Sequence, residues 1–447
     1  MNRRRFLQVA GIAGLAVMAP IAPRVVRAGA VKYKGPFWIM VNAGGGWDPT
    51  MLCDPKGGDP MDPKAPNHSY TAKDILKAGN ISYAPTELQS NMVLVQSCDQ
   101  FFQKHHKRLL VVNGIDNSTN NHDAGSRTTW SGQLPEGYPS FAAIMAASVS
   151  AATPVPLAYL SNGGYDATAG LVSLTRMGGT DALERLAFTN QMNPTDAKTG
   201  LYNTPNTASR IAATQEARLK AAQLKQKLPT VASAMGSLYL ARQGNDGLAG
   251  LGEELRSVKL VNYPDDFPQL DGAGGNGGIE GLLRQVQIAL HSFHAGVAVS
   301  ANLDFGGFDT HSDHDNRQGD ALMGLLFGID YLFDQIDALG LTDQVNVMIG
   351  SDFGRTPFYN KDQGKDHWNI TSAMFSGPKI PGDKVIGGTD PTFGPMTFNP
   401  TSLKADAGGV RIEPKHIHMA LRELGGVAGS AIDKTYGFPG TALPLFA

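Results

Sequence analysis

Short apolar runs that alternate with helical patterns constrain the fold of this 447-residue chain more than any other feature. Five runs are apolar on both faces and are followed by glycine or polar turns, which is typical of buried parallel strands. They lie at residues 37–43, 108–114, 295–303, 344–350 and 372–377. Helical periodicity lies between and after them, at residues 140–151, 281–294, 321–340 and 414–426. The alternation predicts an α/β fold, a mostly parallel doubly wound sheet with helices on both faces.

The middle of the chain has a different pattern. Residues 207–243 are rich in Ala, Lys and Gln at helical spacing, and Pro229 interrupts them, which predicts two helices. The glycine-rich stretch at 271–278 is then a flexible joint that returns the chain to the sheet. We therefore expect one α/β domain over residues 31–447, with a helical insertion or cap at about 165–278.

The first 30 residues predict an export signal. A basic start that includes Arg3 and Arg4 precedes an apolar run at 11–22 and small residues at 28–30. The paired arginines before Phe6 match the twin-arginine pattern, so we expect the twin-arginine translocase as an export partner and the periplasm, or another exported location, as the destination. No later stretch approaches the ~18 apolar residues that span a bilayer, so we expect no stable membrane span after cleavage.

The charge of the chain bears on its possible partners, and its cysteine content bears on disulfide formation. A formal net charge of −2 argues against nucleic acid as a partner, because nucleic acid favours a clustered basic surface. The only cysteines, Cys53 and Cys98, would lie in an oxidising compartment, where either a disulfide or two buried thiols could be present.

Polar residues gather in the stretch "GGFDTHSDHDN" at 306–316, and similar residues follow the other predicted strands. Parallel sheets bind ligands beyond the carboxyl ends of their strands, so these side chains should converge on one edge. Asp and His together are ligands for zinc or manganese, and calcium is a third choice. The strand-end candidates are Asp48, Ser118, Thr119, His122, Asp309, His311, His314 and Asp352, with His367 just before a strand.

The order of these elements resembles the alkaline phosphatase superfamily, which includes phosphatases, sulfatases and cofactor-independent phosphoglycerate mutases. The motifs "GGFDTHSDHDNRQ", "SDFGRTPFYNKDQGKDHW" and "GGGWDP" further resemble an exported branch known only as a domain of unknown function. The resemblance runs over essentially the whole mature chain.

This resemblance implies one or two divalent metal ions. One position would use Asp309, His311 or His314, and His367, while Asp48 and Asp352 would supply the other. The superfamily usually has His where this chain has Phe353, which leaves the second ion open.

The resemblance also implies catalytic residues. In "DNSTNNHDAGSR" the spacing from Ser118 to His122 resembles the mutase pattern, in which a serine attacks phosphorus, and Thr119 is the second choice. Arg355 would either clamp an oxyanion or form a structural salt bridge.

Two functions follow. The first is a periplasmic metal-dependent hydrolase of phosphate or sulfate esters, acting on a small-molecule or polymer substrate through a Ser or Thr nucleophile. The alternative is a catalytically weak or inactive relative that acts as an envelope binding or assembly protein, and Phe353 is the feature that favours it.

Overall fold

A computed structural model describes residues 32–447, apart from short gaps at 60, 63, 88–96, 154, 178–179, 194–195, 197, 229–230, 233–234 and 237–244 and a longer one at 259–276. The predicted export signal at 1–30, the helix break at Pro229 and most of the glycine-rich joint lie outside the described residues. The export route and the destination therefore stay predictions. No helix of the described residues is long and apolar enough to cross a membrane.

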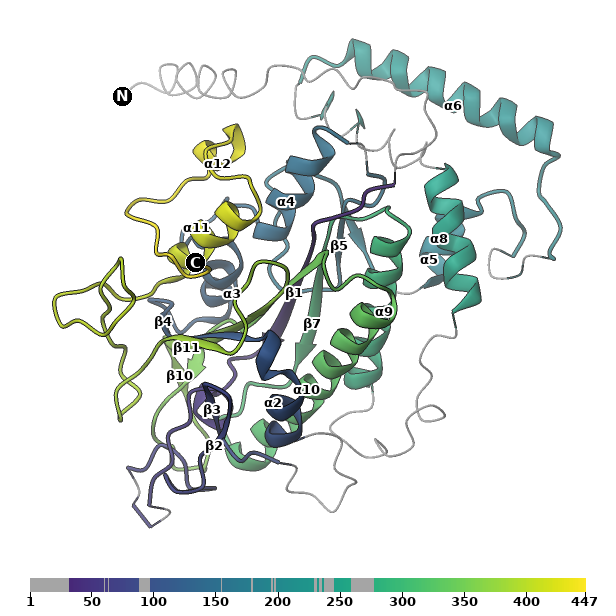
Figure 1. The fold of residues 1–447 in the computed structure, drawn as a ribbon. Helices are drawn as coiled ribbons and strands as arrows, with labels where there is room; N and C mark the ends of the chain where they lie inside the picture. The colour runs from purple at the N-terminus through teal and green to yellow at the C-terminus, as the bar shows by residue number, and fades with distance from the viewer. Residues whose placement is uncertain are drawn as a thin grey trace.

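An eight-stranded sheet forms the centre of the molecule, in the order β12-β4-β11-β8-β1-β7-β5-β6 (Figure 1). The strand β1 runs parallel to both of its neighbours, with Val41 opposite Leu303 on one side and Ile349 on the other. The strands are β1 (Phe37–Gly44), β4 (Leu110–Asp116), β5 (Tyr159–Ser161), β6 (Leu174–Arg176), β7 (Ser300–Gly306), β8 (Val345–Ser351), β11 (Ile370–Ser376) and β12 (Lys384–Gly387). The mostly parallel α/β prediction is confirmed, and β5, β6 and β12 are strands that the sequence analysis missed.

The direction of one strand differs from the prediction. The strand β11 is antiparallel to both β4 and β8, although we expected a parallel strand there. The chain leaves the carboxyl end of β8 and reaches β11 through residues 352–369, where no helix returns it to the opposite edge. Parallel neighbours need such a crossover, so the strand enters from the edge where β8 ends. This geometry folds the 352–369 segment over the carboxyl ends of the central strands.

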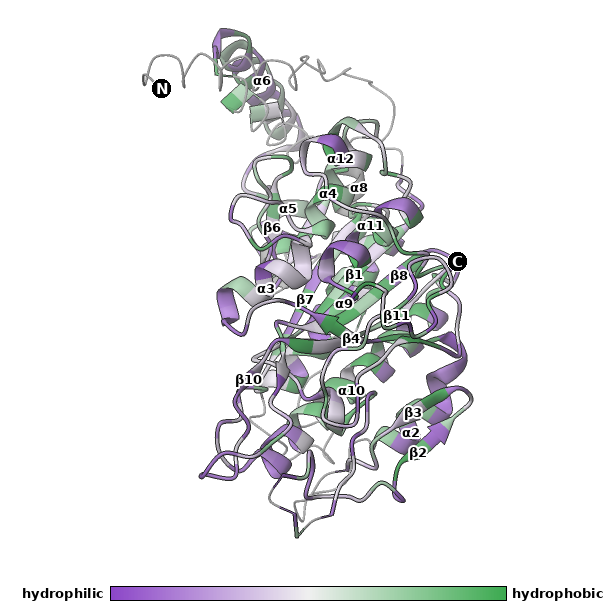
Figure 2. Cartoon of the chain, turned by 90° about the vertical axis from the view of Figure 1, so that its left-hand side faces the viewer, coloured by the Kyte–Doolittle hydropathy of each residue, from purple (hydrophilic) through white to green (hydrophobic). Residues whose placement is uncertain are grey.

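Alternate residues of the strands face two separate cores, as strands buried on both faces require. In β1, Phe37, Ile39 and Val41 belong to one apolar cluster, and Trp38 and Met40 belong to the other. The first cluster contains residues of α2 (Cys98–His105), α9 (Gly277–His294) and α10 (His314–Ala338), and the second contains residues of α4 (Phe141–Ser150) and α11 (Pro414–Leu424). Figure 1 shows the two sets of helices on opposite sides of the sheet, and Figure 2 shows the green, hydrophobic strands between them.

The main helices are α2 (Cys98–His105), α3 (His122–Ser131), α4 (Phe141–Ser150), α9 (Gly277–His294), α10 (His314–Ala338), α11 (Pro414–Leu424) and α12 (Ala431–Thr435). The predicted helices at 140–151, 281–294 and 414–426 are confirmed to within a few residues. The helix α10 begins earlier than predicted, so the last residues of the 306–316 stretch form its first turn. The smaller elements are η1 (Pro49–Met51), β2 (Leu76–Ala78), β3 (Ile81–Tyr83), η2 (His106–Arg108), β9 (Gly354–Arg355) and β10 (His367–Trp368).

The segment predicted as an insertion contains α5 (Thr180–Ala187), α6 (Pro205–Lys225) and α8 (Asn245–Ser257). It also contains β6, which extends the main sheet next to β5. Leu248, Leu251 and Leu255 join α8 to the first apolar cluster, whereas α6 buries none of its residues. Figure 1 shows α6 standing apart from the sheet. The limits of the insertion stay a prediction.

The two cysteines are free thiols, and both are buried. Burial raises the pKa of the Cys98 thiol to about 12, which keeps the thiol protonated and unreactive. Of the two arrangements that the sequence left open, the structure has the thiols rather than the disulfide.

Candidate metal centre

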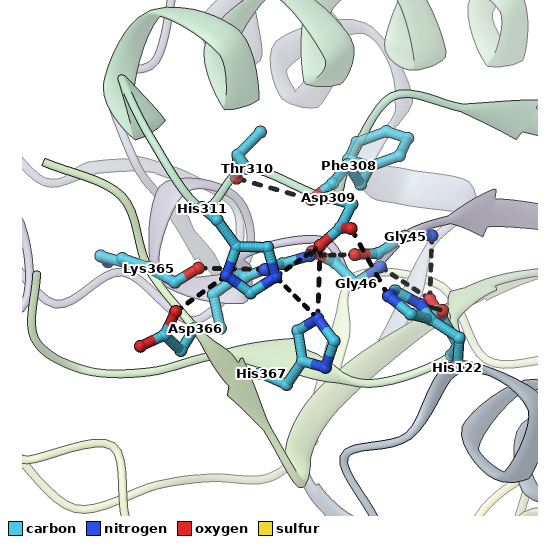
Figure 3. A network of polar contacts seen from close by, with 12 residues as sticks. Gly45, Gly46, His122, Phe308, Asp309, Thr310, His311, Lys365, Asp366 and His367 are labelled. Carbon is cyan, nitrogen blue, oxygen red and sulfur yellow. Dashed lines mark hydrogen bonds and ion pairs between the residues drawn. The ribbon is translucent and has the colours of Figure 1, made fainter. Parts of the chain in front are cut away.

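Three histidines surround one carboxylate beyond the carboxyl ends of the central strands (Figure 3). Asp309 follows β7, and its Oδ1 lies 3.0 Å from His311 Nε2 and 3.3 Å from His367 Nε2. Its Oδ2 lies 3.7 Å from Nε2 of His122, the first residue of α3. The side chains of Asp309, His311 and His122 are 50%, 46% and 40% exposed, so a ligand from solvent has access to the cluster.

Each imidazole is held through its other ring nitrogen. His122 Nδ1 lies 2.6 Å from Asp352 Oδ2, and His311 Nδ1 lies 2.8 Å from Asp366 Oδ1. His367 Nδ1 lies 2.8 Å from the carbonyl oxygen of Asn120. These oxygens only accept hydrogen bonds, so each Nδ1 carries a proton, and the lone pair of a neutral ring is then on Nε2. The Nε2 atoms of all three rings face Asp309. The hydrogen bond to Asp352 raises the pKa of His122, whereas burial lowers the pKa of His367.

This donor set fits a cation. One donor atom each of His122, Asp309 and His367 can be chosen within 4.8 Å of one another, and His311 Nε2 lies 3.0 Å from His367 Nε2. Two lone pairs that face each other at that distance repel unless a proton or a cation lies near both. Imidazole nitrogens oriented by oxygen acceptors, together with one carboxylate, are the usual ligands of zinc and also suit manganese. Calcium prefers oxygen ligands, so the nitrogen-rich set fits it less well.

Arg355 fixes the carboxylate at the centre. Its side chain is fully buried, and its Nη2 donates to Asp309 Oδ1 at 2.7 Å. The other guanidinium donors bond to the carbonyl oxygens of Gly45, Gly46 and Lys365. Burial alone would raise the pKa of Asp309, but the hydrogen bond and charge of Arg355 outweigh it and lower that pKa. Of the two predicted roles of Arg355 the structure has the salt bridge, and the guanidinium is not free to clamp an oxyanion.

Two glycines allow the loop after β1 to approach the cluster. The amides of Gly45 and Gly46 donate to Asp352 Oδ1 at 3.1 and 2.7 Å. Both glycines have positive φ, and a Cβ on Gly45 would lie 2.6 Å from the backbone nitrogen of Asp309. Only glycine fits there, because any side chain would collide with backbone. Asp352 therefore uses one oxygen for these amides and the other for His122.

The apolar ring of Phe353 packs against two of the imidazoles. Its fully buried ring lies 4.8 Å from the ring of His122 and 4.4 Å from that of His367, centroid to centroid. A Cβ on Gly46 would lie 2.4 Å from the Phe353 ring, so the glycine loop packs on its other side.

Asp48 and His314 lie apart from this cluster, in a buried network. Asp48 Oδ2 lies 2.6 Å from Lys365 Nζ and 3.0 Å from His314 Nε2, while its Oδ1 accepts from Thr50 and caps η1. Within the described residues, no hydrogen bond or ion pair joins Asp48 to Asp352. The predicted metal position shared by these two aspartates is therefore not the arrangement in the structure, because a lysine already neutralises Asp48.

The predicted nucleophiles lie in the loop between β4 and α3. Ser118 is exposed, has φ of 56° and donates its amide to Asp116 Oδ1 at 2.9 Å. The loop contacts the histidine cluster through the carbonyl oxygen of Asn120, which bonds to His367, and Asn117 Nδ2 donates to the carbonyl oxygen of Asp352. The residues that flank Ser118 and Thr119 in the sequence thus contact Asp352 and His367, and the catalytic role of the two hydroxyl groups stays a prediction.

Sequence reasoning missed several residues of the site. Asp366 and Lys365 immediately precede His367 in the motif "GKDHW", and Asn120 contributes only its carbonyl oxygen. The adjacency of Asp366 to a candidate ligand was a usable signal. A backbone carbonyl leaves no signal in a sequence.

The solved structures that this chain is similar to include a sulfatase and an alkaline phosphatase. The crystal structure of Ps i-CgsB with k-i-k-neocarrahexaose is 11% identical over 91% of this chain and 75% of that one, with a TM-score of 0.37. A magnesium-bound mutant of TAB5 alkaline phosphatase is 8% identical over 78% and 93%, with a TM-score of 0.29. The PsFucS1 sulfatase from Pseudoalteromonas sp. is 10% identical over 88% and 68%, with a TM-score of 0.30.

Identities and TM-scores this low carry no argument about chemistry, so the relationship to the alkaline phosphatase superfamily stays a prediction. A comparison with the curated proteins gave no match. One family model, described as a protein of unknown function, matches residues 38–405, which is most of the chain and includes every donor of the cluster. The resemblance to a family known only as a domain of unknown function is thereby confirmed, and the chain belongs to the DUF1501 family.

Proposed function

We propose that this protein is a metal-dependent hydrolase of phosphate or sulfate esters. The observation that carries the proposal is the orientation of three histidines, each with Nδ1 bonded to an oxygen acceptor and Nε2 directed at Asp309. The side chains of Asp309, His311 and His122 are partly exposed, so a cation from solvent has access to these donors.

In this proposal His122, Asp309, His311 and His367 hold a divalent ion, zinc or manganese. When bound, such an ion polarises an ester oxygen and offsets the negative charge that develops during displacement. Asp352, Asp366 and Asn120 keep the rings in the binding tautomer, and Arg355 keeps the carboxylate in place. The buried ring of Phe353 packs against His122 and His367.

Ser118 is the first choice for the nucleophile and Thr119 the second. The serine oxygen would bond to phosphorus or sulfur as the bond to the alcohol oxygen breaks, and the alcohol would leave with a proton equivalent to the one that the serine hydroxyl loses. Water would then add to phosphorus or sulfur, break the bond to the serine oxygen and return a proton to it, which releases the acid and restores the serine. Ser118 has a φ of 56°, and non-glycine residues held in this region are concentrated at active sites, which supports the choice.

We propose the periplasm as the location of this hydrolase, with the twin-arginine translocase and an ester substrate as its partners. The basic and apolar start of the chain supports export by the twin-arginine translocase into the periplasm. An exposed site supports a small-molecule or polymer ester as substrate.

A second candidate is a catalytically weak or inactive relative with a binding or assembly role. The pairing of Asp48 with Lys365 favours it, because a second ion would need that carboxylate.

The two candidate functions predict different results when the protein is assayed for ester hydrolysis. The full chain is loaded with Zn²⁺ or Mn²⁺, dialysed, analysed for metal and assayed on matched phosphate and sulfate monoesters. We expect about one tight ion, with hydrolysis reduced at least ~10³-fold by Ser118→Ala, as for loss of a nucleophile. Asp309→Ala should lose the ion, and Ser209→Ala, at an exposed serine on α6, is the control. Metal binding without turnover of any ester supports the second candidate, and a chain that binds no metal refutes the first.

A further inference from the structure

A closed cage of ligand-type atoms surrounds the ammonium group of Lys365. Its Nζ lies 2.6 Å from Asp48 Oδ2, 3.3 Å from Asn67 Oδ1 and 3.4 Å from Thr50 Oγ1. His314 Nε2 lies 3.0 Å from the same carboxylate oxygen. All five side chains are fully buried, with no exposed surface.

The cage is arranged for a positive charge. Burial alone would raise the pKa of Asp48, but Lys365 and His314 outweigh it and hold that pKa far below its usual range, so the carboxylate stays ionised. Burial lowers the pKa of His314, which keeps this imidazole neutral. Thr310 Oγ1 lies 2.7 Å from His314 Nδ1, and the Gln318 amide fits best with its nitrogen toward Thr310 and its oxygen 2.5 Å from the Asp48 amide. These contacts direct His314 Nε2 toward Asp48.

The cage is joined to the histidine cluster through the backbone of Lys365. Its amide donates to the Thr310 carbonyl at 3.1 Å, and its carbonyl accepts from Arg355 Nη1 at 3.0 Å. The next two residues are Asp366, which orients His311, and His367, which is itself a donor of the cluster. Figure 3 shows Lys365, Asp366 and His367 following one another along the edge of the cluster.

We propose that the Lys365 ammonium is a built-in cation, which fills the cage of Asp48, Thr50, Asn67 and His314 in place of an ion from solution. The chain then needs only one exchangeable metal ion, and that count rests on the proposed function. The covalent link of the ammonium to the backbone makes Lys365 a positioning residue for Asp366 and His367. A free ion in the same cage would neutralise Asp48 but would not hold this segment.

The test counts manganese in four proteins, because Mn²⁺ accepts the oxygen ligands of the cage together with one imidazole. The proteins are wild type, Lys365→Ala, Lys365→Ala/Asp48→Asn and Lys361→Ala, which removes an exposed lysine of the same loop. Each is incubated with MnCl₂, dialysed and analysed for bound manganese, and its melting temperature is measured with and without Mn²⁺.

We expect Lys365→Ala to hold one manganese ion more than wild type, because truncation opens the cage while leaving its ligands. The double variant and Lys361→Ala should hold the wild-type number. The measured quantity is the difference in bound manganese between Lys365→Ala and wild type. If wild type holds no manganese and Lys365→Ala holds one ion, the proposed function is refuted, but the inference about the cage is still supported. A folded Lys365→Ala variant with the wild-type manganese count overturns the inference.

Folding itself provides the second measurement. If Lys365→Ala does not fold, the cause under this proposal is a buried carboxylate without its cation, so the double variant should fold and Mn²⁺ should raise the yield of the single variant. A double variant that is as unfolded as the single one would show that Lys365 supports the fold through packing of its chain, and would refute its role as a cation.

Discussion

Asp366 shows how one exposed side chain can orient another. Its side chain is 54% exposed, yet Oδ1 lies 2.8 Å from His311 Nδ1 and 3.2 Å from Asn360 Nδ2. The bond to His311 is the main reason that the pKa of Asp366 is lowered. An ionised carboxylate at this place keeps the proton on Nδ1 and makes Nε2 a better metal ligand.

We predict that Asp366→Asn weakens metal binding by ~10–100-fold, the usual effect of losing the hydrogen-bond partner of a metal-bound histidine. The amide can still bond to Asn360 or His311, so the fold should be kept and the melting temperature of the metal-free protein should change little. Competition with a chelator measures the affinity. Asp362→Asn removes an equal charge from an exposed residue of the same loop and should change nothing. Equal affinities of the two variants would contradict the role of Asp366.

Among the elements, α11 is docked on α3 through a buried histidine. His418 is fully buried, and its Nε2 donates to the carbonyl oxygen of Thr129 at 2.8 Å. Its Nδ1 has no hydrogen-bond partner in the described part of the chain. Burial lowers the pKa of His418 to about 3, even though the bond to Thr129 acts in the opposite direction. The contact therefore anchors the helix whose first residue is His122, a member of the histidine cluster.

This burial predicts a specific loss of stability in acid. Above the ordinary histidine pKa near 6.5, both the folded and the unfolded chains hold His418 neutral, so the contribution to stability is complete. As the pH falls toward 3, only the unfolded chain takes up the proton, and stability is lost by about 1.4 kcal/mol per pH unit. Wild type should therefore lose ~2–3 kcal/mol more than His418→Gln between pH 7 and pH 4.5, measured by urea unfolding. His106→Gln is the surface control, and parallel pH curves for all three proteins would refute the prediction.

The prediction of export by the twin-arginine translocase concerns the whole molecule and is tested by changing the two arginines. Changing Arg3 and Arg4 together to Lys should leave unprocessed precursor in the cytoplasm, because the pattern requires both arginines. Fractionation followed by detection of the chain with an antibody measures the distribution. Arg5→Lys makes the same chemical change beside the pair and should be exported normally. Normal processing of the double variant would indicate another export route.

The sequence by itself determined the class of fold and the place of the site. Apolar periodicity is a local property, so it predicts β1, β7 and β8 and the helices around them whatever the loops do. The carboxyl ends of parallel strands meet at one edge of a sheet. The positions of Asp309 and Asp352 directly after β7 and β8 in the chain are therefore enough to place both carboxylates at the same edge.

Only the tertiary structure decided which polar side chains meet. Asp48 and Lys365 are 317 positions apart, and nothing local to either residue indicates that they form a buried pair. The same holds for His122 with Asp352, and for Asn120, whose carbonyl oxygen bonds to His367. The antiparallel direction of β11 brings the 352–369 segment back over the cluster, and with it Arg355, Asp366 and His367. Hydrogen bonds depend on directions and distances of a few ångströms, and those are set by how long loops close in space rather than by the spacing of residues along the chain.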